Sequence, residues 1–237
     1  MARDPREPHS TFLNLHSTEF WSGDLGLTLV TISLVILIFA ISPLGKSGIL
    51  GRIFLDLTMV TLMISGALTL NQGLAGKVLV IAAITASAVV LTTARIHPTP
   101  LLHQLGSFLS TVTLLLYCRI VLLLMFRHGQ ITWSRIQGGL SAYLLLGMAW
   151  ASAFEFVEYM HAGSFHFVYA PANIDELSSK LSYFSFTTLT TVGLGDVTPL
   201  TSYARSLSMA EAVTGQLFPA VLMGALVAMA LQSRPKP

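Results

Sequence analysis

The residues with the clearest chemical meaning form the run Thr190-Thr191-Val192-Gly193-Leu194-Gly195-Asp196. It lies between two long apolar stretches, and irregular backbone at membrane depth is tolerated only where it is buried in protein or lines a water-filled path. Gly193 and Gly195 can adopt positive φ without a Cβ clash, so that consecutive backbone carbonyls can point the same way. A row of carbonyl oxygens can replace the hydration shell of a cation. The run therefore predicts a path for dehydrated ions.

The composition indicates that the elements around this run lie in a membrane. Of the 237 residues, 53% are hydrophobic and only 10% are charged, whereas soluble domains carry about 25% charged residues. A net charge of +2 argues against a nucleic-acid partner. The single cysteine, Cys118, excludes a disulfide framework. We find no catalytic constellation, and we expect neither an enzyme nor a small-molecule substrate.

A transmembrane helix needs about 20 mostly apolar residues, and several stretches meet this requirement. They predict an all-α membrane protein with six spans: Leu25–Leu44, Ile53–Leu70, Val78–Thr93, Leu105–Phe126, Ile136–Tyr159 and Leu207–Leu231. We expect four regions, namely a cytosolic tail (1–24), a four-helix peripheral domain (25–126), a domain around the Gly-containing run (132–232) and a short C-terminal tail (233–237).

The segment between the fifth and sixth spans differs from the others. Residues 161–172 have the mixed composition of a loop. Asn173 then precedes two acids, Asp175 and Glu176, which is typical of a helix N-terminus. The apolar run 177–189 is long enough for about three turns but too short to span a membrane. We therefore predict a re-entrant helix that ends at the Gly-containing run and directs the negative end of its dipole toward the ions.

From Tyr183 to Gly224 the chain resembles the pore module of potassium channels, beginning Y-F-S-F-T-T-L-T-T-V-G-L-G-D-V-T-P-L. The resemblance implies that K⁺ binds the carbonyls of Thr191, Val192, Gly193 and Leu194 and the Thr191 hydroxyl. Gly195 would close the outer mouth. The residues that would support the filter are Thr190, Asp196, Tyr183 and Phe184, the last two as an aromatic cuff.

The resemblance also carries expectations for the assembly and its place. One loop supplies a quarter of a carbonyl ring, so the chain would form a homotetramer. K⁺ would pass through it passively, as the permeant ion and not as a cofactor, across a plasma membrane, in the manner of bacterial six-span relatives. Membrane lipid would be the other partner.

The sequence departs from the common family pattern at several positions. Leu194 replaces the more frequent tyrosine of the filter, and Thr187 stands where some bacterial channels have a buried glutamate. Glu211 lies within the sixth span, where a carboxylate is costly and functional by default. It would either form a hydrogen bond to the back of the filter or pore helix and support it, or face water or another polar contact. Gly215 and Pro219 are candidate gating hinges, with close helix packing as the alternative reading for the glycine.

Charged residues elsewhere give weaker signals. The fourth span contains one cation, Arg119, and lacks the regular series of a voltage sensor, so we expect weak voltage dependence. Arg119 would form a structural ion pair with Asp56, with a role in voltage sensing as the alternative. Four residues at the outer end of the fifth span read as a solvated rim, with cation attraction or proton sensing as the alternative: Glu155, Glu158, His161 and His166.

Other functions remain open at this point. Small changes near the second glycine can remove an ion site, which would give a nonselective cation channel. A potassium-uptake transporter subunit would also use a degenerate filter, although such proteins usually carry four loops in one chain. A third alternative is a non-conducting structural membrane protein. Selective potassium flux separates these classes.

Overall fold

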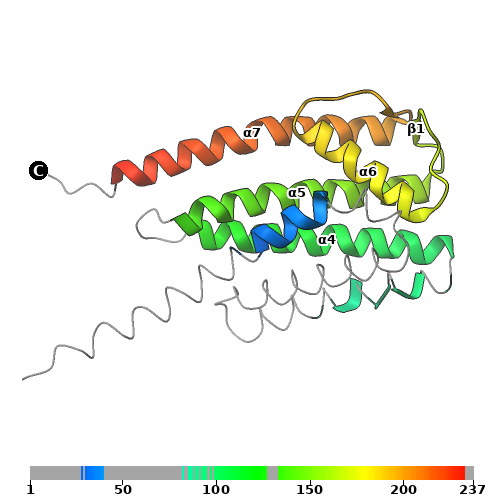
Figure 1. Ribbon diagram of the computed structural model, residues 1–237, viewed down its shortest axis with the longest axis horizontal. Helices are drawn as coiled ribbons and strands as arrows, with labels where there is room; N and C mark the ends of the chain where they lie inside the picture. Colours follow the sequence, from blue (N-terminus) through cyan, green and yellow to red (C-terminus); the bar gives the residue numbers. More distant parts are fainter. Residues whose placement is uncertain are drawn as a thin grey trace, which may run out of the picture.

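Figure 1 shows the computed structural model, a bundle of helices whose long axes run mostly side by side. The structure describes residues 28, 30–39, 82, 85–87, 89–90, 92–94, 97, 99–126 and 133–232. Its elements follow in the order α4 (Pro100–Met125), α5 (Trp133–Met160), β1 (Phe165–Phe167), α6 (Ile174–Leu189), β2 (Val197–Pro199) and α7 (Ser202–Gln232).

Three of the described helices are long and apolar enough to cross a membrane: Pro100–Leu123, Arg135–Met160 and Ser202–Ala228. They correspond to the predicted fourth, fifth and sixth spans. The last helix begins at Ser202 and not at Leu207, because the Thr201 hydroxyl accepts a hydrogen bond from the Ala204 N–H at 3.3 Å and caps a polar first turn.

The first three predicted spans are described only in part. Val30–Phe39 and Thr85–Ala94 are apolar helical segments that overlap the first and third, whereas the second, Ile53–Leu70, lies outside the described residues. Asp56 lies there too, so the predicted pair with Arg119 stays a prediction. Arg119 itself is exposed on α4.

Helices α4 and α5 form an antiparallel pair, and the segment 28–39 packs on them (Figure 1). Thr28 donates a hydrogen bond to the Gln137 side chain at 3.0 Å, and the hydroxyls of Thr31 and Ser141 are 2.6 Å apart. The apolar core beneath them contains Val30, Leu34, Tyr117, Cys118, Val121, Ala142 and Leu145. The segment 28–39 and α4 thus pack against α5, the helix that leads into β1 and α6.

The short helix α6 lies obliquely against α5 and α7 (Figure 1). Its predicted start is confirmed, since the Asn173 side chain accepts the Glu176 N–H at 2.9 Å. At 16 residues it is about 24 Å long, too short to span. An apolar cluster of Phe154, Phe165, Leu181, Phe184, Val197 and Ala204 holds it in place.

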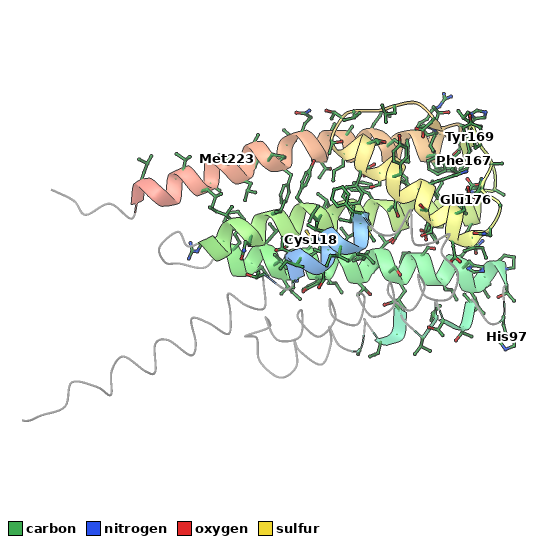
Figure 2. All side chains as sticks on the ribbon, viewed as in Figure 1. His97, Cys118, Phe167, Tyr169, Glu176 and Met223 are labelled. Atoms are coloured by element: carbon green, nitrogen blue, oxygen red, sulfur yellow. The ribbon has the colours of Figure 1, made fainter. Side chains whose placement is uncertain are left out.

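The prediction of a plain loop over 161–172 was incomplete. Within it, β1 pairs with β2 in an antiparallel register that sets Phe167 opposite Val197. Side chains alternate along β1, with Phe165 buried and His166 exposed, which is the period of a strand. Figure 2 shows Phe167, Tyr169 and Glu176 gathered at this end of the bundle, with Met223 far along α7 toward the other end. The sheet fixes the chain directly after Asp196.

Candidate ion-conducting loop

The backbone between α6 and β2 alternates between two conformations. Thr191, Gly193 and Gly195 have φ of 61°, 54° and 82°, whereas Val192 and Leu194 between them keep negative φ. The positive φ predicted for Gly193 and Gly195 is confirmed. Such alternation turns successive carbonyls toward the same side of the strand, which an ordinary extended strand does not do.

Thr191 adopts positive φ although it is not a glycine. A β-branched residue in this region is a genuine outlier and stores about 1–3 kcal/mol, a strain that persists only when the surroundings impose it. This strain could not be predicted from the sequence, because threonine by itself favours the extended region.

Hydrogen bonds to α6 impose that conformation. The Thr187 carbonyl accepts N–H groups from both Val192 at 2.8 Å and Gly193 at 3.1 Å, and the Thr188 carbonyl accepts the Thr191 N–H at 2.9 Å. The Thr190 hydroxyl donates to the Phe186 carbonyl at 2.6 Å. Carbonyls that a helix terminus normally leaves without partners therefore hold the loop, and Thr187 contributes through its backbone.

The outer end of the loop is held at Asp196. Its carbonyl accepts the Val168 N–H at 3.0 Å, and its carboxylate faces the Tyr183 phenol on α6. Partial desolvation and the negative charge of Asp196 raise the pKa of the Tyr183 phenol above its usual value, so the hydroxyl keeps its proton and can donate toward the carboxylate.

Tyr183 and Phe184, which the resemblance pairs in an aromatic cuff, face different surroundings. Tyr183 is 38% exposed, whereas Phe184 is buried. The Phe184 ring packs between Phe154 and Phe165, with ring centroids at 5.1 and 5.4 Å. Phe184 thus anchors α6 in the core of the single chain, and the cuff itself stays a prediction.

Gly215 on α7 lies against the end of α6. A Cβ added there would stand 1.9 Å from the carbonyl oxygen of Leu189, so close packing accounts for the glycine and hinge motion is not needed to explain it. Pro219 lies inside α7, which continues to Gln232. Because proline has no N–H, it cannot form the regular helical bond to the Gly215 carbonyl four residues before it. Bending at this pair stays a prediction.

Gln216, which was not predicted from the sequence, reaches the loop that follows α6. Its side-chain amide donates to the Thr191 hydroxyl at 3.1 Å. An amide in an otherwise apolar span was the signal available in the sequence. The contact joins α7 to the innermost residue of the predicted ion path.

Glu211 is completely buried, and its expected alternative position facing water is wrong. Its Oε1 lies 2.5 Å from the hydroxyl of Ser185 on α6, which is itself 2.7 Å from the Gly147 carbonyl on α5. A Cβ at Gly147 would lie 2.5 Å from the Phe186 ring. Ser185 and Gly147 were missed because a serine and a glycine in apolar helices have no distinctive pattern.

The reading of the outer acids as a solvated rim is incomplete, because Glu155 and Glu158 both accept hydrogen bonds from within the chain. Glu155 accepts hydrogen bonds from Ser178 on α6 at 2.5 Å and, more weakly, from Ser107 on α4 at 3.5 Å. It therefore joins three helices. Glu158 accepts the backbone N–H groups of Gly163 and Phe165 at 2.9 and 3.1 Å and so orders the turn before β1.

The two histidines at this end remain near the surface. The His161 ring stacks on Tyr203 with centroids 5.5 Å apart, while His166 is exposed on β1. Both histidines therefore have the solvated position that was predicted for them.

The loop lies open on the surface of the single chain. Val192 and Leu194 are 60% and 65% exposed. On α7, an apolar row at a spacing of four residues is also exposed: Met209, Val213, Leu217 and Val221. One chain leaves both the loop and this helix face uncovered.

A comparison with protein-family models finds one match, described as ion channel, over residues 156–232. This part of the chain is similar to an ion channel. The match covers the end of α5, α6, the loop and α7, which is less than half of the sequence. It supports a pore-loop cation channel that conducts ions passively. No curated protein matches the chain.

Proposed function

We propose that the chain is one subunit of a homotetrameric potassium channel, whose filter carbonyls at Thr191, Val192, Gly193 and Leu194 bind K⁺ in succession. The observation that carries this proposal is the alternation of φ at Thr191, Gly193 and Gly195 directly after α6. It is the backbone geometry that a row of inward carbonyls requires, and an ordinary turn between two helices has no need of it.

The assembly of several copies is supported by the surfaces that one chain leaves exposed. A carbonyl row can surround a dehydrated ion only as part of a ring. The exposed loop and the exposed apolar row on α7 are surfaces that further copies would cover. The end of α5, α6 and α7, which the family match includes, would form the centre. The segment 28–39 and α4 would form the periphery beside lipid, within a plasma membrane.

Selectivity for K⁺ over Na⁺ rests on the threonine, the two glycines and the tethers at Thr187. They hold the carbonyls in place while Leu194, which lacks the hydroxyl of a tyrosine, contributes only its backbone oxygen. We expect this filter to remain selective because its tethers are backbone hydrogen bonds that do not involve the Leu194 side chain.

The test is ion flux through the purified full chain in liposomes. Reversal potentials in opposed K⁺ and Na⁺ gradients should lie near the K⁺ equilibrium potential. Reversal near zero would indicate a nonselective cation channel. Flux that stops unless a second ion moves with K⁺ would indicate a transporter subunit, and a protein that holds no ions and carries no flux would be structural.

A further inference from the structure

The hydroxyl of Ser185 has two oxygen neighbours but one hydrogen. It lies 2.7 Å from the Gly147 carbonyl and 2.5 Å from Glu211 Oε1, and both distances are those of hydrogen bonds. A carbonyl oxygen can only accept, and a hydroxyl donates once. If Glu211 were ionised, one of the two contacts would join oxygens with no hydrogen between them. A proton on Glu211 satisfies both.

The surroundings of Glu211 agree with a neutral acid. The side chain is completely buried, and Oε2 has no hydrogen-bond partner. No lysine, arginine or histidine of the described chain forms an ion pair with it. The titratable group that faces it is Tyr143 on α5, whose hydroxyl donates to the Leu189 carbonyl at 3.3 Å. An unpaired buried carboxylate would be far more costly than a neutral carboxyl.

We propose that Glu211 is a proton-carrying positioning residue that donates a hydrogen bond to Ser185, which in turn donates to the Gly147 carbonyl. These two hydrogen bonds connect α7, α6 and α5 behind the filter. The inference deepens the proposed channel function and rests on it for its effect on conduction. The Oε1–H group of Glu211 donates a hydrogen bond to Ser185 Oγ. The Ser185 O–H group donates to the Gly147 carbonyl, so each hydrogen has one acceptor.

The helix spacing explains why this proton would reach the filter. Glu211 and Gly215 are four residues apart on one face of α7, and Ser185 and Leu189 are four apart on α6. Glu211 meets Ser185, and one turn farther along Gly215 meets Leu189. Loss of the proton would place an unpaired negative charge at the contact between Glu211 and Ser185. That charge would be solvated only if α7 moved away from α6 or water entered between them. Thr187, whose carbonyl holds the loop, lies between the two contacts on α6.

The experiment uses the full-length protein in liposomes and the variant Glu211→Gln, whose amide can donate to Ser185 at nearly the same size but cannot lose a proton. Infrared difference spectra at neutral pH should contain a protonated-carboxyl band in the parent that is absent in Glu211→Gln. Potassium flux in the parent should fall about tenfold or more as alkaline pH removes the proton, which corresponds to about 1.4 kcal/mol or more of lost stabilisation. Glu211→Gln should conduct with no such alkaline loss.

A matched control is Glu176→Gln, because Glu176 lies on α6, the helix that carries Ser185, but pairs with Lys180 at 3.2 Å near the surface. It should keep both the band and the alkaline loss of flux. The inference is overturned if no band disappears in Glu211→Gln, or if that variant loses flux at alkaline pH as the parent does. A parent that carries no K⁺ flux at any pH would reject the channel function, while the infrared measurement would still decide the proton.

Discussion

The Cα of Gly215 lies so close to the carbonyl of Leu189 that an added Cβ would stand 1.9 Å from its oxygen. Leu189 is the last residue of α6, and the loop begins directly after it. The position of α7 and the end of α6 are therefore fixed together at one backbone contact. A shift of α7 at Gly215 would therefore displace the start of the loop directly, with no side chain between them.

Gly215→Ala should separate α7 from α6, because the oxygen that it would meet belongs to the backbone and cannot rotate away. We expect a loss of about 1–3 kcal/mol in the stability of the assembly and reduced K⁺ flux, measured by thermal melting in detergent and by liposome flux. Gly224→Ala is the matched control on the same helix, since a Cβ there meets nothing within 4 Å, and it should be neutral or slightly stabilising. Equal behaviour of the two variants would contradict the packing role.

Gly193→Ala should abolish K⁺ flux while the protein still folds. A Cβ at Gly193 meets nothing within 4 Å in the chain, but its φ of 54° costs a non-glycine residue about 1–2 kcal/mol, and relaxing it would turn carbonyls away from the ion path. Gly163→Ala is the control, because Gly163 has a φ of 84° and equal space but lies in the outer turn. If both variants keep full flux, the alternation is not needed for conduction.

Gln216→Met should lower selectivity, because it removes the donor to the Thr191 hydroxyl while keeping the side-chain length. A hydrogen bond of this kind contributes about 0.5–1.5 kcal/mol, so the K⁺/Na⁺ permeability ratio should change by roughly twofold to tenfold. Reversal potentials provide the measurement. An unchanged ratio would mean that the amide has no part in setting the innermost site.

Glu155→Ala should loosen α6 from α5 and the peripheral helix α4. Its carboxylate is the acceptor for Ser178 and Ser107 in partly buried contacts, and removing one partner of such a contact costs about 1–3 kcal/mol at most. A double-mutant cycle with Ser178→Ala, followed by thermal melting, should give a coupling of about 0.5–3 kcal/mol. Additive losses from the two variants would show that the two side chains act independently.

Open probability should change only shallowly with voltage. Arg119 is the only lysine or arginine within α4, and each charge that crosses the field contributes about 2.3 kcal/mol per 100 mV. Single-channel recording over a range of about 200 mV tests this. Steepness equivalent to several moving charges per subunit would contradict it and would require a sensor elsewhere in the chain.

The sequence by itself determined the local features. The Asn173 cap, the start of α6 and the positive φ of Gly193 and Gly195 depend on a few neighbouring residues whose backbone preferences are strong. Apolar length likewise predicted the helices α4, α5 and α7 to within a few residues. The three-residue strand β1 was not predicted, because it exists only through pairing with β2, some 30 residues along the chain.

Only the tertiary structure decided the roles of Glu155, Glu211 and Gly215. Two carboxylates in apolar helices look alike in sequence, and their partners come from other helices, so whether they meet water or a serine depends on how those helices pack. Gly215 shows the same limit, because a glycine reads equally as a hinge or a contact until the neighbouring backbone is known. The positive φ of Thr191 opposes its own preference, and only hydrogen bonds from the surrounding chain can hold it there.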